Sequence, residues 1–448
     1  MNKADLIIIG AGPGGYRAAE YAARQGLKVV VFEAAEVGGT CLNVGCIPTK
    51  TYVHSATFDE ARSRMAQVVP QLRQGVEGIL SHPNITLVRA PAAFTAPAAV
   101  RPSAAFTAPA AIRPVVGGIS ADTFTAPAII IATGSETKWL PIEGAKTAYH
   151  VVDSTGLLQL DTLPRRLCII GAGVIGMEFA SVFSRFGSEV TVIEYLKECL
   201  PALDGDIAKR LRKQMERQNI SFNMQCAVKQ IADGEVFFEN RKGQTQSVEA
   251  DVVLMATGRK PCTAGLNLQA AGITLSPDGS IPVDDNFQCP LFNGQSSRVY
   301  AIGDCNGRQM LAHAAEMQAV RAVNHILGKS DGIRFDIMPA AIFTEPEAAC
   351  VGPTEDQLKA AATPYVCRKA FWRASGKALA MGETEGMLKL FASPDDGLIL
   401  GCHAYGAHAA DIVQEVSVLM CKHTTLAELA DMVHIHPTLS EILKTAAD

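Results

Sequence analysis

Two cysteines stand five positions apart in the stretch Gly-Gly-Thr-Cys-Leu-Asn-Val-Gly-Cys-Ile-Pro-Thr-Lys, which covers residues 38–50. Such a pair can form a structural disulfide, supply half of a metal site, or cycle between dithiol and disulfide. Ten of the twelve cysteines are scattered singly through the chain, a pattern typical of buried thiols in a reducing compartment. The close pair, Cys41 and Cys46, is therefore the first candidate for chemistry.

A structural disulfide between these cysteines would close a very short loop, so it would stabilise the fold little. A cytosolic thiol pool would also oppose it. A zinc site would need further ligands at suitable spacing, but His54 stands alone and the chain contains no Cys-x2-Cys motif. A redox pair needs one sulfur that faces an electron acceptor and one that is open to attack, with nearby positive charge or a helix N-terminus to stabilise the thiolate.

The cysteines follow a pattern of strand, glycine turn, helix and strand over the first 33 residues. Gly10, Gly12 and Gly15 occupy the three glycine positions of a dinucleotide fingerprint, which allow a tight turn, close approach to a pyrophosphate and close helix packing. Glu33 follows Gly10 by 23 positions, where a carboxylate can accept hydrogen bonds from ribose hydroxyls. This arrangement predicts a first dinucleotide site.

The same spacing returns later in the chain, with the residues Gly171, Gly173, Gly176 and Glu194. A second dinucleotide site is therefore predicted. Glu194 would repel a 2'-phosphate, and no arginine beside it could accept one, so NAD(H) is favoured over NADP(H). Each unit ends in a similar strand and turn, at residues 130–135 and 254–259, which indicates two Rossmann-type domains in series.

Length and composition limit what else the protein can be. A chain of 448 residues suggests about three domains. Its net charge of -5 comes from 45 acidic and 40 basic residues without basic blocks, so nucleic acid is not an expected partner. The chain starts directly in a strand pattern rather than a signal peptide, and it contains no apolar run of about 18 residues. We therefore expect a cytoplasmic protein without membrane insertion.

Two later segments differ from this pattern. From about residue 337, alternating apolar strands and helix-like segments predict a separate α+β domain. Residues 92–102 return almost unchanged at 104–114, and Phe-Thr-Ala-Pro appears a third time at 124–127. The repeats favour a local tandem duplication that lengthens a surface β-excursion, with a partner-docking linker as the alternative.

The cysteine stretch, the two fingerprints and His-Ile-His-Pro-Thr-Leu-Ser-Glu at 434–441 together resemble the class I FAD-dependent pyridine nucleotide-disulfide oxidoreductases. Within that family the match is to the dihydrolipoamide dehydrogenases, and it spans nearly the whole chain. The resemblance implies an α/β protein with two Rossmann-type domains and an α+β dimerisation domain. It implies an FAD-binding domain at 1–145, an NAD-binding domain at 146–265, a central segment at 266–336 that completes the FAD domain, and an interface domain at 337–448.

The resemblance also implies roles for individual residues. Cys46 would be the thiolate that faces the flavin, and Cys41 would exchange with substrate. His436 would deprotonate the incoming dithiol, with Glu441 fixing its tautomer, and both would come from the other subunit of a homodimer. Lys50 would lie near the flavin and pair with Glu178 of the second helix. The remaining implied contacts are Gly39, Thr40, Ala92, Gly134, Asp304 (flavin ribitol) and Ala312 for FAD, and Val228 and Gly258 for NAD.

The function that follows from the resemblance is oxidation of protein-bound dihydrolipoyl groups, with electrons passing through the redox-active pair and FAD to NAD+. The lipoyl protein would belong to a 2-oxoacid dehydrogenase or a glycine cleavage system. Two alternatives remain open. One is a sibling reductase that uses NADH to reduce another disulfide, an oxidant or a metal species, and the other is a flavin-bound redox sensor or scaffold.

Overall fold

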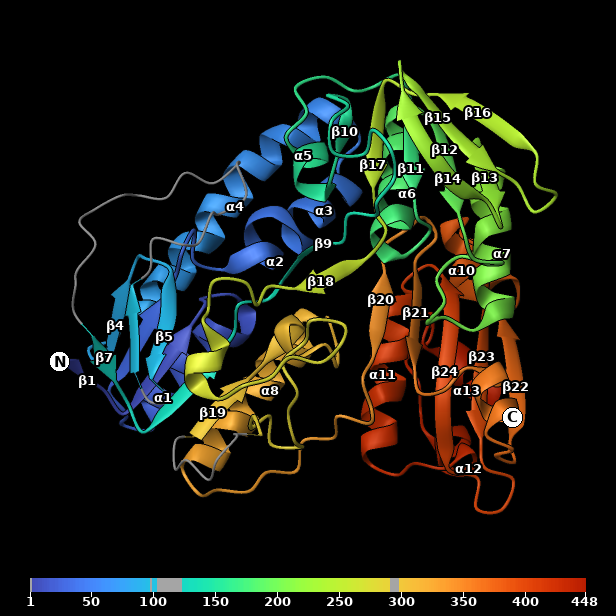
Figure 1. Cartoon of the computed structure of the whole chain (residues 1–448). Helices are drawn as coiled ribbons and strands as arrows, with labels where there is room; N and C mark the ends of the chain where they lie inside the picture. Colours follow the sequence, from blue (N-terminus) through green and yellow to red (C-terminus); the bar gives the residue numbers. More distant parts are fainter. Residues whose placement is uncertain (1, 97–98, 103–122, 291–297) are drawn as a thin grey trace. The chain divides into compact units, whose positions relative to one another are not determined.

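The computed structural model describes residues 2–96, 99–102, 123–290 and 298–448. The chain divides into two compact units (Figure 1). Unit 1 comprises Met1–Thr51, Asp59–Lys138 and Arg259–Ile333, and unit 2 comprises Tyr52–Phe58, Trp139–Gly258 and Arg334–Asp448. Each unit is therefore assembled from segments that lie far apart in the sequence.

The main sheet of unit 1 has five parallel strands in the order β4-β3-β2-β8-β19. These strands are β2 (Leu6–Ile9), β3 (Val29–Phe32), β4 (Ile85–Val88), β8 (Ala128–Ile131) and β19 (Arg298–Ala301). Strands β2, β3 and β8 are buried along their whole length, as continuous apolar runs in a parallel sheet require. The strand order reverses between β2 and β8, which is where doubly wound sheets bind ligands.

Helix α1 (Pro13–Arg24) follows β2 through the first glycine turn. Gly12 caps it and Pro13 occupies its first position, where a missing N–H costs nothing. A Cβ added at Gly15 would lie 1.9 Å from the carbonyl oxygen of Gly10, so only glycine lets this helix start so close to the strand. The other helices are α2 (Gly39–Val44), α3 (Cys46–Val53), α4 (Phe58–Leu80), η1 (Leu268–Ala271), η2 (Gly303–Asn306) and α8 (Ala312–Ile326).

Two smaller strand groups complete unit 1. The strands β1 (Asn2–Lys3), β7 (Phe124–Thr125), β6 (Ala99–Pro102) and β5 (Ala92–Ala96) form a sheet in that order. Its β5–β6 pair is antiparallel and holds the first copy of the repeated segment, whereas the second copy, at 104–114, lies outside the described residues. A two-stranded antiparallel ribbon joins β9 (Ser135–Thr137) to β18 (Arg259–Pro261).

Unit 2 contains a second parallel sheet, ordered β10-β17-β11-β12-β13, and the antiparallel sheet β14-β15-β16. A Cβ at Gly176 would lie 2.0 Å from the Gly171 oxygen, so this glycine turn repeats the geometry of the first. The helices are α5 (Ser154–Leu158), α6 (Val174–Phe186) and α7 (Gly205–Glu216). The strands are β10 (Val151–Val152), β11 (Arg166–Ile170), β12 (Glu189–Glu194), β13 (Ile220–Met224), β14 (Ala227–Ala232), β15 (Glu235–Glu239), β16 (Thr245–Glu249) and β17 (Val252–Met255).

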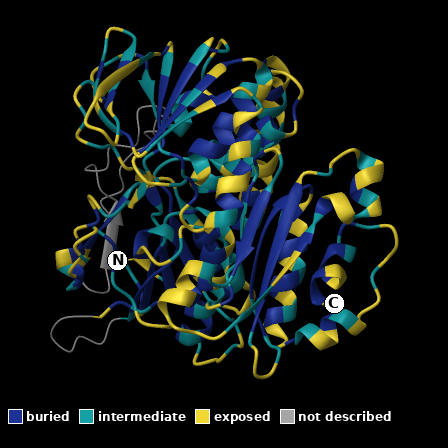
Figure 2. Ribbon diagram, turned by 90° about the vertical axis from the view of Figure 1, so that its right-hand side faces the viewer, coloured by how far each residue is buried: buried dark blue, intermediate teal, exposed yellow. Residues whose placement is uncertain are grey.

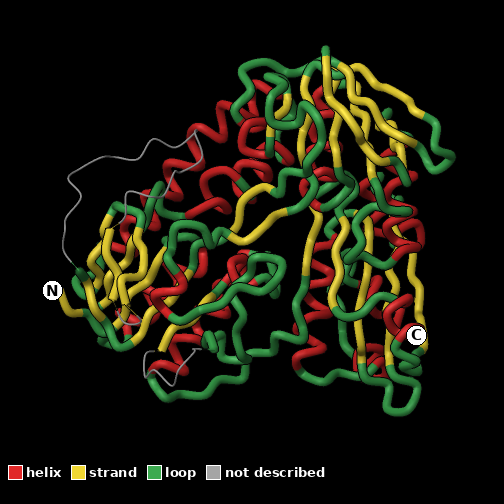
Figure 3. The backbone as a smooth tube through the Cα atoms, in the orientation of Figure 1, coloured by secondary structure: helices red, strands yellow, loops and turns green. Residues whose placement is uncertain are grey.

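The C-terminal part of unit 2 is built on an antiparallel sheet, ordered β20-β21-β24-β23-β22, whose long strands are yellow in Figure 3. Figure 2 shows its central strands as buried. These strands are β20 (Ala340–Ile342), β21 (Ala348–Val351), β22 (Val366–Phe371), β23 (Gly386–Ala392) and β24 (Ile399–Gly406). The helices are α9 (Glu355–Ala360), η3 (Trp372–Ala374), α10 (Gly376–Met381), α11 (Ala409–Cys421), α12 (Leu426–Asp431) and α13 (Glu441–Ala447).

The expected fold class, two Rossmann-type sheets and a C-terminal α+β domain, is confirmed by these sheets. The predicted domain boundaries stay predictions, since the two compact units divide the chain in another way. Across the residues that the structure describes, no helix combines the length and the apolar character needed to cross a bilayer.

A buried cation ties the C-terminal sheet to the start of α7 within unit 2. Lys389 of β23 is fully buried, and its Nζ lies 2.7 Å from Asp204 Oδ1 and 2.6 Å from Glu355 Oε2. Asp204 caps α7, and its backbone N–H donates to His403 Nδ1 at 3.0 Å. The hydrogen bond from Lys389 lowers the pKa of the Glu355 carboxyl to about 2. The network therefore depends on one lysine.

Replacing this lysine should destabilise the protein strongly. We expect Lys389→Met to lower the free energy of unfolding by about 3–5 kcal/mol in denaturant titrations at neutral pH, because it removes the cation from the buried Asp204 carboxylate, whereas Glu355 keeps its pair with Lys359 at 3.2 Å. The control is Lys369→Met, since Lys369 is exposed and lies 3.8 Å from Asp206, a pair worth about 1 kcal/mol or less. Equal losses in the two variants would contradict the role of the network.

The pair of Lys389 and Glu355 also makes the stability of the protein depend on pH. Because the pKa of Glu355 falls from 4.5 to about 2 on folding, its contribution to stability is present above pH 4.5 and is lost as the pH falls towards 2. Lys389→Met should flatten this part of the stability profile, measured by thermal unfolding at a series of acid pH values.

Candidate active site

The two cysteines lie on two short, consecutive helices. Cys41 lies in α2, and Cys46 is the first residue of α3. A Cβ added at the intervening Gly45 would lie 2.8 Å from the Thr40 carbonyl oxygen and 3.3 Å from the Cys41 Cα. Gly45 therefore lets the chain fold back and bring the second cysteine against the first. The residues predicted from the sequence do not include Gly45, although its place between the two cysteines is a signal for such a turn.

The two sulfurs of the pair lie in different environments. Both are reduced cysteines in this structure, with Cys46 exposed and Cys41 half-buried. The pKa of Cys41 is raised, first by its hydrogen bond to Cys46, then by burial and by the negative charge of Cys46, while Lys50 opposes the shift. These contributions favour the protonated form of Cys41. Cys46 is the first residue of α3, where the helix dipole favours an anion.

A carboxylate, that of Glu316, also influences Cys41. The Tyr16 hydroxyl on α1 donates a hydrogen bond to Glu316 Oε1 on α8 at 3.3 Å. Burial raises the pKa of Tyr16 to about 12, and the negative charge of Glu316 and its hydrogen bond to Tyr16 add to the shift. Glu316 also raises the pKa of Cys41. Neither residue could be assigned to this site from the sequence, because 300 positions separate them.

Glycine contacts bring these elements together. A Cβ at Gly39, at the start of α2, would lie 2.7 Å from the Gly12 Cα at the start of α1. A Cβ at Gly14 would lie 3.2 Å from the Ala315 oxygen on α8. The cysteine helix, the fingerprint helix and α8 therefore meet closely, with Cys41, Tyr16 and Glu316 one or two positions beyond these contacts.

The acidic residues of the two fingerprints brace their own glycine turns. Glu33 accepts hydrogen bonds from the backbone N–H groups of Ala11, at 2.6 Å, and Ala35, at 2.8 Å. Glu194 accepts from Ala172 at 2.6 Å and Leu196 at 2.7 Å. The sequence predicted only a contact with ribose. The structure adds this internal bracing, and each carboxylate oxygen keeps a second lone pair for a ribose hydroxyl.

The glycine turns fit the pyrophosphate groups of dinucleotides. Helices α1 and α6 begin at Gly12 and Gly173 without a hydrogen bond from a capping side chain, so their first backbone N–H groups can face an anion. Apart from the chain neighbours, no atom of the described residues lies within 4 Å of where a Cβ would stand at Gly173, at Gly134 or at Gly258. These three predicted cofactor contacts therefore border open space.

The other predicted contacts are distributed over both units. In unit 1, Thr40 is in α2, Lys50 is in the last turn of α3, Ala92 starts β5, Asp304 lies in η2 and Ala312 starts α8. In unit 2, Val228 lies in β14, and Glu178 is buried in α6, where it accepts a hydrogen bond from Phe343 N at 2.9 Å. Because Lys50 and Glu178 belong to different units, their pairing stays a prediction.

A histidine and a carboxylate lie together near the C-terminus in unit 2. His436 Nδ1 lies 2.9 Å from Glu441 Oε1, and Glu441 Oε2 accepts a hydrogen bond from Thr438 N at 2.9 Å. The hydrogen bond from His436, followed by that from Thr438, lowers the pKa of Glu441. With Nδ1 engaged by the carboxylate, Nε2 is the nitrogen that can exchange a proton. The nearby His434 instead lies 3.5 Å from Glu415.

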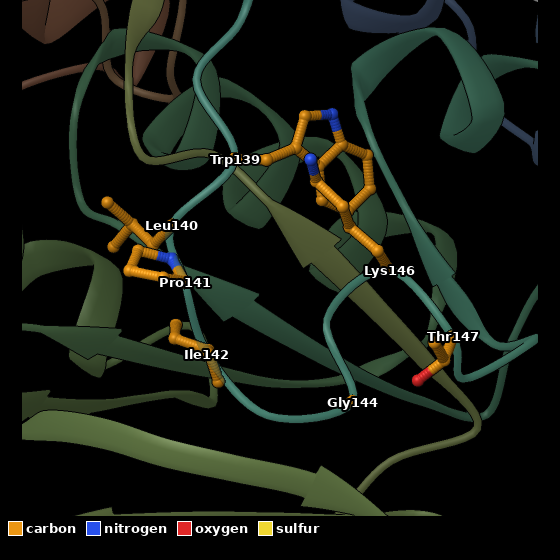
Figure 4. A pocket seen from close by; sticks show the side chains of 7 residues that line it. All are labelled: Trp139, Leu140, Pro141, Ile142, Gly144, Lys146 and Thr147. Carbon is orange, nitrogen blue, oxygen red and sulfur yellow. The ribbon is translucent and has the colours of Figure 1, made fainter.

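Two further observations concern a pocket and possible metal ligands. A pocket of about 300 Å³ in unit 2 is lined by Trp139, Leu140, Pro141, Ile142, Gly144, Lys146 and Thr147, none of them a predicted site residue (Figure 4). Among the described residues, no group of three or more His, Cys, Asp or Glu side chains could hold a metal ion.

The charge of Glu316 leads to a test of the asymmetry between the sulfurs. Glu316→Gln removes a negative charge that raises the pKa of Cys41, so the pKa should fall and more thiolate should form at a given pH. We expect alkylation of Cys41 in the reduced protein to become roughly 3- to 10-fold faster near pH 8, as measured by peptide mass spectrometry.

The matched control for this variant is Glu20→Gln. Glu20 lies on α1, one turn beyond Tyr16, and pairs with Arg17 and Arg24. It also carries one negative charge, but it is not among the strongest influences on the pKa of Cys41, whereas Glu316 is. If both variants accelerate Cys41 alkylation equally, Glu316 has no specific effect on the pair.

Comparisons with known proteins bear on the whole chain. The family model for the pyridine nucleotide-disulphide oxidoreductases matches residues 4–319, and the model for their dimerisation domain matches 338–447. The mitochondrial dihydrolipoyl dehydrogenase of Pisum sativum is 35% identical, with 99% of this chain and 90% of that protein aligned. The dihydrolipoyl dehydrogenase of Thermus scotoductus is also 35% identical, over 100% of this chain and 97% of its own.

Among solved structures, the Cu(II) complex of the HOCl-induced flavoprotein disulfide reductase RclA from Escherichia coli matches with a TM-score of 0.88. It is 30% identical, and the match covers 100% of this chain and 99% of that one. These matches confirm the predicted cofactors, FAD and NAD(H), and the predicted enzyme class. The chain therefore belongs to the pyridine nucleotide-disulphide oxidoreductases, the FAD-dependent enzymes that exchange electrons between NAD(H) and disulfides.

Proposed function

We propose that this enzyme oxidises dihydrolipoyl groups and passes their electrons to NAD+. The observation that carries the proposal is the combination of an asymmetric thiol pair, Cys41 and Cys46, with a histidine that is oriented by a carboxylate. A dithiol substrate needs both features, because it must lose a proton before it attacks a disulfide. The dihydrolipoyl dehydrogenases among the relatives support this choice of dithiol.

The reaction balances as a two-electron exchange. One substrate thiolate attacks Cys41 in the oxidised pair, the bond between the two cysteine sulfurs breaks, and Cys46 leaves as a thiolate. The second substrate thiol then displaces Cys41, which gives the cyclic disulfide product. FAD, when bound, supplies the transfer of two electrons from the cysteine pair to NAD+, which yields NADH and a proton.

The chain's own residues divide this work. Cys41 keeps its proton in the reduced pair, whereas Cys46 carries charge at the N-terminus of α3 and has an exposed surface on which an electron acceptor can lie. His436 accepts the proton of the substrate thiol through Nε2. Glu441 holds the ring and stabilises its protonated form through the bond to Nδ1.

We propose further that the site is completed by a second copy of the chain, with His436 supplied by the partner subunit. The match to the dimerisation domain supports a homodimer. In the single chain, Val433 is 99% exposed and Ile435 is 79% exposed, immediately before His436. Exposed apolar side chains that border a functional residue are typical of a surface that another protein covers. The lipoyl protein of a 2-oxoacid dehydrogenase or glycine cleavage system would then deliver the substrate.

A second candidate function is the NADH-driven reduction of an oxidant or a metal species. It is favoured by the similarity to RclA, which matches nearly end to end and whose structure is described as a Cu(II) complex. In this direction two electrons from NADH would reduce the cysteine pair, and the pair would reduce two Cu(II) ions to Cu(I). The metal would be a substrate in this reaction.

The role of the histidine can be tested separately from the redox pair. We expect His436→Gln to slow dihydrolipoamide oxidation by about 10²- to 10⁴-fold, because it removes the base, while NADH oxidation by an artificial electron acceptor changes little. His408→Gln is the control, since His408 is also exposed and lies 3.4 Å from a carboxylate, that of Asp411. A similar loss of both activities in His436→Gln would count against the assignment.

Steady-state assays distinguish the two candidate functions. Dihydrolipoamide with NAD+ is compared with NADH and Cu(II), each in the wild type and in Cys46→Ser. The first function predicts fast turnover with dihydrolipoamide at typical enzyme rates of about 1–10³ per second, lost in Cys46→Ser. Turnover with NADH and Cu(II), but not with dihydrolipoamide and NAD+, would establish the second function. Turnover with neither substrate would leave a redox sensor or scaffold, and would refute both proposals.

A further inference from the structure

The antiparallel ribbon of β9 and β18 connects the two predicted nucleotide-binding parts of the chain. Lys138, just after β9, ends one segment of unit 1, and Arg259, the first residue of β18, begins the next. Residues 139–258 between them belong to unit 2. The ribbon pairs Thr137 with Arg259 and Ser135 with Pro261. Figure 1 labels its two strands, β9 and β18. The chain thus leaves and re-enters unit 1 along two hydrogen-bonded strands.

Arg259 makes a forked contact across this ribbon. Its Nε donates to the Ser135 hydroxyl at 2.7 Å, and its Nη2 donates to the Ser135 carbonyl oxygen at 2.6 Å. The Ser135 hydroxyl in turn donates a hydrogen bond to Asp304 Oδ2. Arg259 Nε itself lies 4.0 Å from the same carboxylate oxygen. Arg259, Ser135 and Asp304 therefore form one connected chain of charge and hydrogen bonds.

The order of donors in this chain fixes the orientation of the carboxylate. A serine hydroxyl has one proton, and since its oxygen already accepts from Arg259, that proton is available to Asp304. Asp304 Oδ2 is thereby engaged, and Oδ1 is left for another donor. The side chains of Arg259 and Asp304 are only 18% and 25% exposed, so solvent screens their interaction less than it would at the surface.

The ribbon also frames Gly134, another predicted flavin contact. The Thr133 hydroxyl donates to the Cys262 carbonyl oxygen at 2.6 Å, and Cys262 N donates to the Gly134 oxygen at 3.0 Å. Gly134 has a φ of +71°, and in the part of the chain that the structure describes no atom beyond its chain neighbours lies within 4 Å of where its Cβ would stand. Residues 259–262 therefore hold both Gly134 and Asp304, which lie about 170 positions apart in the chain.

We propose that Arg259 and Ser135 are positioning residues for the flavin site: they hold the Asp304 carboxylate so that its free oxygen can accept a hydrogen bond from the ribitol chain of FAD. The proposal concerns retention of the cofactor, so it does not depend on which disulfide or oxidant the enzyme uses. It rests on the predicted contact of Asp304 with FAD. It also implies that the strand which returns from the predicted NAD-binding part helps to build the flavin site.

The adjacent Lys260 provides a matched control. It lies on the same strand and also pairs with an acid of β9, since its Nζ is 2.9 Å from Glu136 Oε1. The side chains of Lys260 and Glu136 are 54% and 50% exposed, so this pair lies at the surface. Lys260→Met therefore removes the same charge from the same strand without touching Asp304.

The test measures FAD dissociation from the purified holoenzyme, by the rise of free-flavin fluorescence after dilution, and by titration of the apoprotein with FAD. We expect Arg259→Met and Ser135→Ala each to weaken FAD binding by roughly 10- to 100-fold. Arg259→Lys should be intermediate, because it keeps the charge but loses the fork. Lys260→Met should stay within about twofold of the wild type.

A double mutant tests whether Arg259 acts through Ser135. If it does, Arg259→Met combined with Ser135→Ala should bind FAD about as weakly as the weaker single variant, instead of showing the product of both losses. Thermal unfolding of the apoproteins, compared with the wild type, reports any general loss of structure. Should Arg259→Met fail to fold, Ser135→Ala still tests the proposal.

Two outcomes would overturn the proposal. One is wild-type FAD retention in both Arg259→Met and Ser135→Ala, and the other is an equal loss in Lys260→Met. Since the measurements contain no dithiol, a failure to oxidise dihydrolipoamide refutes the proposed substrate but leaves these results unaffected.

Discussion

The close contact between a glycine and a carbonyl oxygen in each fingerprint turn is the constraint on which the rest of this structure depends. A Cβ at Gly15 would lie 1.9 Å from the Gly10 oxygen, and one at Gly176 would lie 2.0 Å from the Gly171 oxygen. Any side chain at either position would force the helix away from its strand. The glycines thereby set where each helix begins, and so where its first N–H groups can meet a pyrophosphate.

The cysteine pair depends on the first of these turns. Gly39 packs against Gly12, so α2 starts at the fingerprint, and Gly45 then lets α3 fold back towards α2. The charges around the pair follow from that packing. Lys50 on α3 and Glu316 on α8 shift the pKa of Cys41 in opposite directions, and burial and the contact with Cys46 raise it. Two chemically identical residues thus lie in different surroundings.

The polar contacts between distant segments follow one physical principle. Lys389 is buried with Asp204 and Glu355, and Arg259 is partly buried with Ser135 and Asp304. Each cation is removed from water and compensated by carboxylates or oxygens that come from other parts of the chain. Such networks are sensitive to the loss of a single member, because the remaining groups lose their partner while burial still keeps water from replacing it.

Much of the fold could be predicted because its signals are local. Glycine spacing, apolar strand runs and the acid 23 positions after the first glycine depend on backbone geometry within a single βαβ unit, so they are legible in the sequence. The paired glutamates show the limit of such predictions. The sequence predicts that Glu33 and Glu194 contact ribose. Their hydrogen bonds to the backbone of their own glycine turns depend on the folded conformation of those turns, which the sequence does not specify.

The amino-acid sequence alone was sufficient for the two nucleotide-binding units, the cysteine pair and the C-terminal α+β domain, since each is encoded by neighbouring residues. Gly45 was also within reach of the sequence. Only the tertiary structure could join Tyr16 to Glu316, Arg259 to Asp304 through Ser135, and Lys389 to Asp204. These contacts link residues from 45 to 300 positions apart. Electrostatic interactions depend on the distance between charges in space, and that distance cannot be derived from their separation in the sequence.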